Sequence, residues 1–228
     1  MADSDNRNIM EKERDILSEA IIAHNVALAA EHASSLTITP AILALAKKTL
    51  NKVRSDDEKF KLACKIYGNL LEKADFDVLE KVYYQNAGSV GEGDIALDVK
   101  YEMGRRELYK AINNGDVDTV RSLARREIIR EVINEDHLKL AIKKHDDELP
   151  AGKTDKDRSN APRKTPAKKP DAPVSKATQI VKILFQHTET PVLEALKQGS
   201  SWSVTELIKE ELASREIGKN HPLNRWLT

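Results

Sequence analysis

Four cations in a proline-rich tract are the residues of this chain best suited to binding phosphate. Arg163, Lys164, Lys168 and Lys169 lie in the sequence PRKTPAKKP. Prolines keep such a segment extended. Its lysine and arginine side chains can neutralise nucleic-acid phosphates without reading a base sequence, and such binding weakens as the salt concentration rises. The tract therefore predicts a contact with nucleic acid. A soluble spacer, or a nuclear-import signal in a eukaryotic source, remains the alternative.

The C-terminal segment supplies a second set of candidate contacts. VLEALKQGSSWSVTELIKEELASREIGKNHPLNRWL resembles a helix-turn-helix of the winged-helix type. On this resemblance VLEALKQG is the first helix, SVTELIKEEL the second, and a recognition helix begins around 218–222. Asparagine can pair with adenine, and arginine with guanine or phosphate. The resemblance thus implies nucleic-acid contacts at Arg215, Lys219, Asn220, His221, Asn224 and Arg225.

The same segment also fits a different role. Trp202, Leu223, Trp226 and Leu227 provide large apolar side chains. They could form the core of a small helical module that docks on a protein. The two interpretations differ in the last ten residues, which are exposed in a recognition helix and buried in a docking module.

One pair of residues suggests catalysis. Arg130 and His137 in REVINEDH resemble the Arg-x4–6-His motif of the HEPN family of all-helical ribonucleases. The resemblance implies that the two side chains converge on the scissile phosphate across a dimer interface. Glu131 stands where that family prefers a polar residue such as asparagine. We expect an exposed arginine and a histidine at a helix start, and we predict a protein that is not an enzyme. A HEPN-like ribonuclease is the alternative.

The histidines and the cysteine show no metal-site pattern. His24 and His32 are eight residues apart, as are His137 and His145, and neither pair forms a His-Glu-x-x-His motif. Cys64 is the only cysteine, and its place in FKLACKIYGNLL predicts a buried, small apolar role. We therefore expect no metal site, no cofactor and no intrachain disulfide.

The elements that position these residues are predicted to be helices. Aromatic residues make up 4% of the chain and there are only nine glycines. Apolar positions recur with helical spacing, for example in one long helix from Ile9 to about His32. Thr39-Pro40 predicts a helix start, and Asn-Gly-Asp at 114–116 predicts the end of one helix and the start of the next. The chain is therefore expected to be all-α.

Charge and composition divide the chain into three parts. The formal net charge is −5 for 1–149, +5 for 150–176 and zero for 177–228. Segment 150–176 holds five of the eight prolines and no aromatic residue, so it cannot bury enough apolar surface to fold by itself. We predict a bundle of about seven helices in 1–149, a disordered basic linker in 150–176, and a three-helix module in 177–228.

This three-part organisation predicts a non-enzymatic regulatory or accessory protein. Residues 1–149 would bind a protein partner or a second copy, and residues 150–228 would contact nucleic acid. The alternative is an adaptor with two docking modules and no nucleic-acid binding. No apolar run approaches the ~18 residues needed to cross a bilayer, so we expect no membrane partner and a cytoplasmic location, or a nuclear one in a eukaryote.

Overall fold

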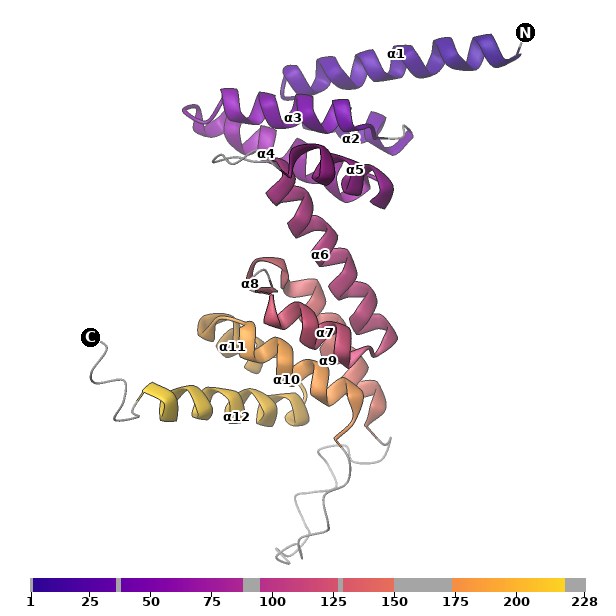
Figure 1. Ribbon diagram of the computed structural model, residues 1–228. Helices are drawn as coiled ribbons and strands as arrows, with labels where there is room; N and C mark the ends of the chain where they lie inside the picture. The colour runs from indigo at the N-terminus through magenta and orange to yellow at the C-terminus, as the bar shows by residue number, and fades with distance from the viewer. Residues whose placement is uncertain (1, 36–37, 88–94, 127–128, 150–173, 220–228) are drawn as a thin grey trace, which may run out of the picture. The chain divides into compact units, whose positions relative to one another are not determined.

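A computed structural model describes residues 2–35, 38–87, 95–126, 129–149 and 174–219, and for 2–10, 34–35 and 217–219 it describes the backbone alone. Every regular element in these ranges is a helix, which confirms the all-α prediction (Figure 1). The chain divides into two compact units, 1–103 and 104–228. The sequence had placed the boundary in segment 150–176 instead.

Unit 1 is built from five helices and the first part of a sixth. The helix pairs α1 with α2, α2 with α4, and α3 with α4 pack against one another. Its core is aliphatic, with Leu17, Leu43, Leu70, Leu79 and Val99 almost completely buried. The helices are α1 (Ala2–Ile22), α2 (Val26–Ser35), α3 (Pro40–Lys52), α4 (Asp57–Lys73), α5 (Phe76–Asn86) and α6 (Ile95–Asn114).

Two sequence predictions about unit 1 are wrong. The long helix expected from Ile9 to His32 is two helices, because His24 takes a left-handed backbone conformation (φ 58°) and the Asn25 side chain caps α2 by accepting the Leu28 N–H at 3.1 Å. Cys64 is exposed rather than buried, since it lies outside the buried stripe of α4. Partial desolvation still raises the pKa of its thiol.

Unit 2 joins helices from both sides of segment 150–173 in one core. Leu108, Ile112 and Leu123 come from before the segment, and Leu184 and Phe185 come from after it; all are at most 2% exposed. The helices are the rest of α6, then α7 (Val117–Arg125), α8 (Ile129–Val132), α9 (Glu135–Glu148), α10 (Lys176–His187), α11 (Thr190–Lys197) and α12 (Trp202–Lys219).

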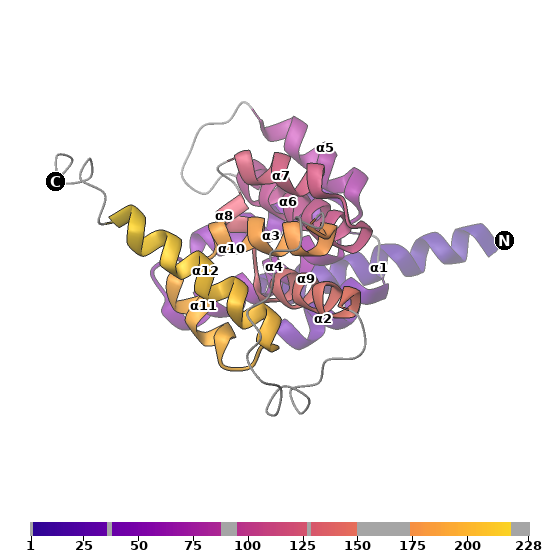
Figure 2. The ribbon, with the colours of Figure 1, turned by 90° about the horizontal axis from the view of Figure 1, so that it is seen from below.

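Helix α10 is central to this arrangement. It packs against α7, α9 and α12, and it lies beside α9 and α12 in both views (Figure 1 and Figure 2). The residues after segment 150–173 therefore share a core with 104–149 instead of forming a module with its own core. Size favours this arrangement, because a module of about 50 residues would be only marginally stable alone.

Two predicted turns, one in each unit, are confirmed. Thr39 caps α3 with Pro40 in the first turn. Gly115 has a positive φ of 66° after the end of α6, and the Asp116 side chain caps α7 by accepting the Thr119 N–H at 3.0 Å. The predicted disorder of 150–176 concerns mainly residues 150–173, which lie outside the described residues. Lys176 is already the first residue of α10.

Candidate functional site

Most residues predicted to touch nucleic acid lie outside the described part of the chain. Arg215 alone has a described side chain, and Lys219 is the last residue of α12 with only its backbone described. The others belong to the undescribed ranges: Arg163, Lys164, Lys168, Lys169, Asn220, His221, Asn224 and Arg225. Whether these candidates form one surface therefore stays a prediction.

Arg215 is engaged within unit 2. Its Nε donates to Glu211 at 2.8 Å, its Nη1 donates to the Thr190 hydroxyl at 3.1 Å, and its Nη2 donates to the Phe185 carbonyl. The side chain thus connects α12 with the end of α10 and the start of α11. A phosphate at this guanidinium would have to displace bonds that hold three helices together.

The helices of the helix-turn-helix resemblance are present only in part. α11 and α12 coincide with its first and second helices and pack together. α12 continues through Gly218 to Lys219, past the point where the recognition helix was expected to begin. Residues 220–228 lie outside the described residues, so the contact surface implied by the resemblance stays a prediction.

His137 has a structural role at the start of α9. It is 3% exposed. Its Nδ1 forms a reciprocal cap with Asn134, and its Nε2 lies 2.9 Å from the Arg105 carbonyl oxygen of α6. Its ring also forms a T-shaped pair with Tyr109, with 6.2 Å between the ring centroids. The structure confirms the expected histidine at a helix start and shows that its imidazole is buried.

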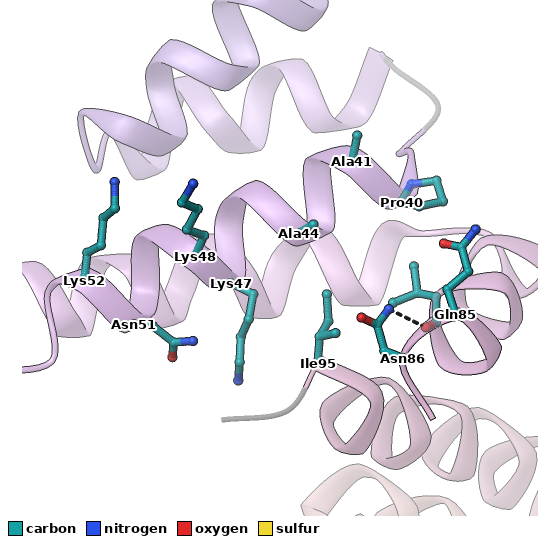
Figure 3. A pocket seen from close by; sticks show the side chains of 11 residues that line it. Pro40, Ala41, Ala44, Lys47, Lys48, Asn51, Lys52, Gln85, Asn86 and Ile95 are labelled. Carbon is teal, nitrogen blue, oxygen red and sulfur yellow. Dashed lines mark hydrogen bonds between the residues drawn. The ribbon is translucent and has the colours of Figure 1, made fainter. Parts of the chain in front are cut away.

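A groove in unit 1 lies between α3, the end of α5 and the start of α6 (Figure 3). Its volume is about 870 Å³. Ala41 and Ala44 are exposed and leave the α3 wall shallow. Figure 3 shows Lys48 and Lys52 projecting from α3 on the side opposite to Lys47. The remaining lining residues are Pro40, Asn51, Val82, Gln85, Asn86 and Ile95.

The three lysines of this groove are not equivalent. Lys47 is only 12% exposed, forms an ion pair with Asp98, and lies over the Tyr67 ring at 5.3 Å. Lys48 and Lys52 are exposed and form no ion pair with the described residues. The charge of Lys47 is therefore satisfied within unit 1, whereas Lys48 and Lys52 form a cationic rim open to a ligand.

A larger groove, of about 1340 Å³, lies within unit 2. One wall comes from the α8–α9 corner and includes Ile133 and Leu138. The other wall is α11. His187 also lines the groove, and its pKa is lowered by burial and then by the neighbouring Arg130 charge. The further lining residues are Arg130, Glu131, Asn134, Glu135, Thr188, Glu189, Thr190, Pro191, Val192, Ala195, Leu196 and Arg215.

A buried imidazole links three helices of unit 2. His145 of α9 is 3% exposed. Its Nε2 lies 2.8 Å from the Ser203 hydroxyl of α12, and its Nδ1 lies 3.0 Å from the Thr178 hydroxyl of α10. Burial lowers the pKa of His145 although Asp146 and Glu148 oppose this shift. The cluster therefore connects α9 with α10 and α12.

The cluster around His145 could not be predicted from the sequence. Thr178 and Ser203 lie 33 and 58 residues from His145 along the chain, whereas motif spacing relates only residues that are close in sequence. The hydroxyl of Ser201, the residue before α12, also donates to Asp146 at 2.8 Å. The His145–Thr178 contact brings the end of α9 close to the start of α10.

The described residues contain neither a metal-binding cluster nor a helix suited to crossing a membrane. No group of three His, Cys, Asp or Glu side chains in that part of the chain could hold a metal ion. None of the described helices combines the length and the apolar character needed to cross a membrane. No protein-family model, curated protein or solved structure matches this chain.

Proposed function

We propose that this protein is a non-enzymatic interaction protein whose unit 1 docks a helix of a partner protein in the groove of α3, α5 and α6. The observation that supports this is the exposed face of α3. Ala41, Ala44, Lys48 and Asn51 follow one another at intervals of three and four residues, so they share one face of the helix. An amphipathic helix binds in such a groove through its apolar side chains.

The partner helix is expected to carry acidic residues along one edge. Lys48 and Lys52 lie one turn apart on the rim of the groove and face solvent. Opposite charges on the partner would fix its orientation and speed its association, although each exposed pair contributes only about 0.2–1 kcal/mol. The small side chains of Ala41 and Ala44 allow the partner backbone to approach closely.

Reversing the two rim charges should weaken binding of such a helix by about tenfold, equivalent to about 1.4 kcal/mol. The probe is a fluorescein-labelled, stapled helical peptide with leucines on one face and glutamates one turn apart along one edge. Its affinity for the full chain is measured by fluorescence anisotropy. The variants are Lys48→Glu with Lys52→Glu, which changes the rim, and Ala44→Trp, which fills the groove.

A matched control makes the same charge change on α4. Lys61 and Lys65 are exposed in unit 1 but do not line the groove, so Lys61→Glu with Lys65→Glu should bind the peptide as the unmodified chain does. A peptide with lysines in place of its glutamates should bind poorly. Equal affinity of the original peptide for the unmodified chain and for both groove variants would contradict this docking site.

A second candidate function is nucleic-acid contact through segment 150–176. Because the end of α9 lies beside the start of α10 (Figure 1), a connection of about 2–8 residues would suffice in a helical bundle. Segment 150–173 is much longer, and long connections in compact domains are usually functional or linkers. Its excess of positive charge suits a polyanion.

Neutralising the four cations of this segment should make DNA binding less dependent on salt. Each phosphate contact contributes a slope of about −0.9 to a plot of log K against log salt concentration. The slope should therefore become less negative by about 3–4 when all four are changed to glutamine. The measurement is a salt titration of the full chain on a random duplex. The residues changed are Arg163, Lys164, Lys168 and Lys169.

The control removes the same number of charges from the surface of unit 1. It changes four exposed lysines to glutamine: Lys61, Lys65, Lys81 and Lys100. An unchanged slope in the segment variant would remove these cations from the interface. No binding to duplex at low salt would refute the nucleic-acid candidate and leave the adaptor without nucleic-acid binding.

A further inference from the structure

The groove of unit 2 has apolar walls that the described part of this unit leaves uncovered. Val192 of α11 is 40% exposed. Pro191 is also exposed, and Ile133 and Leu196 are half-buried, although all four line the same groove. Apolar side chains gathered in a concave surface typically mark a binding site. The docking helix proposed for unit 1 does not account for this groove.

The end of α12 brings the C-terminal segment within reach of this groove. Arg215 lines the groove, and α12 ends four residues later at Lys219, which is about 6 Å further along the helix axis. Nine residues follow, and nine residues can span up to about 30 Å. They read NHPLNRWLT and include Leu223, Trp226 and Leu227.

We propose that the groove between α8, α9 and α11 is the docking site for the chain's own C-terminal segment, residues 220–228. The chemistry of the two surfaces agrees. Leu223, Trp226 and Leu227 provide the apolar surface that the walls require, and a single tryptophan can bury about 150–250 Å². Pro222 cannot continue the hydrogen bonding of a helix, so the chain can turn away from the axis of α12 towards the groove.

Charge also favours this occupant. Glu131 and Glu189 are exposed at the groove and form no ion pair with the described residues. Arg225 lies between the apolar residues of the segment and can reach these carboxylates when the apolar side chains enter the groove. Arg215 is already paired with Glu211, so the exposed Arg130 is the one lining cation that opposes these two carboxylates among the described residues.

The covalent connection makes even a weak contact effective. A short tether gives an effective concentration in the millimolar range, so a segment with millimolar affinity in trans is substantially bound in cis. Any protein that uses the same groove must then compete with residues 220–228. The segment therefore acts as a built-in competitor, and its release is a means of regulating access to unit 2.

The fluorescence of Trp226 tests this docking directly. The only other tryptophan, Trp202, is replaced by phenylalanine in the full chain so that the emission reports Trp226 alone. In the docked state the emission of Trp226 should be blue-shifted, and acrylamide should quench it poorly. Both effects should be the same at every protein concentration from about 1 to 100 µM, because a tethered contact does not depend on concentration. Val192→Asp should abolish the protection, whereas Val174→Asp, exposed outside the groove, should not.

A second measurement separates docking from a folding defect. A labelled peptide of residues 218–228 should bind the chain truncated after Lys219 at least about tenfold more tightly than it binds the full chain, a difference of about 1.4 kcal/mol. Full quenching of Trp226 in the parent chain would overturn the proposal. Protection that increases with protein concentration would overturn it as well, since a second copy would then be the occupant. Equal peptide affinity for both chains would also refute the tethered contact.

Discussion

Replacing Phe185 by alanine should lower the free energy of unfolding of unit 2 by about 3–5 kcal/mol. Phe185 of α10 is 1% exposed and belongs to the core that includes Leu108 and Leu138. Removing the ring leaves a cavity among side chains from both sides of segment 150–173. Because a domain is stable by only about 5–15 kcal/mol, the loss is a large part of the total.

Urea unfolding followed by far-ultraviolet circular dichroism measures this effect in the full chain. The transition of unit 1 should keep its midpoint, since Phe185 does not contribute to its core. Val174→Ala is the control, because Val174 lies just before α10 and is 52% exposed. This substitution should change the free energy of unfolding by no more than about 0.5 kcal/mol. Loss of helicity confined to the residues after 173 would contradict a shared core.

Acidification from about pH 8 to pH 5.5 should destabilise unit 2 through His145. The folded protein lowers the pKa of this buried imidazole, whereas an unfolded histidine titrates near 6.5. Below that pH the unfolded chain takes up a proton that the folded chain resists. Stability is therefore complete above the unfolded pKa and falls as the pH drops towards the folded pKa, by up to about 1.4 kcal/mol per pH unit.

The groups around His145 determine the sign of this effect. Asp146 and Glu148 on α9 favour its protonation, but burial outweighs them. The partners on α10 and α12, Thr178 and Ser203, are neutral hydroxyls. A protonated ring would donate from both nitrogens, so both hydroxyls would have to accept. His187, whose pKa burial also lowers, acts in the same direction.

The variant His145→Gln isolates this contribution. It cannot titrate, so the pH dependence of the unfolding free energy should become shallower by about one proton. At pH 8 it should also cost about 1 kcal/mol, because a half-buried hydroxyl loses its partner. His32→Gln in unit 1 is the control and should leave the unit 2 transition unchanged. An unchanged pH dependence in His145→Gln would remove this residue as its source.

The helices and several of their boundaries could be predicted from sequence because their causes are local. Thr39 with Pro40, and Gly115 with Asp116, act within a few residues, and the structure confirms both turns. The break between α1 and α2 is local too. It was missed because apolar spacing continues across it, although Asn25 is a typical cap residue.

The composition of units could not be predicted because helical periodicity does not identify what covers an apolar face. The apolar stripe of α10 includes Ile180, Leu184 and Phe185. Its sequence pattern would be the same whether the helix packed in a three-helix module or against α7 and α9, as it does. The shift in composition at 150–176 is real, but a change in composition is not by itself a boundary between folded units. The same limit explains why the two grooves could not be found from sequence.

Amide hydrogen exchange on the full chain and on Phe185→Ala tests most directly that residues 104–149 and 174–219 form one cooperative unit. The slowest amides of α7, α9 and α10 should open with the same free energy in the unmodified chain. That free energy should fall equally in all three helices of the variant, since they share one core. Loss of protection in α10 alone, with α7 and α9 as protected as before, would contradict the account.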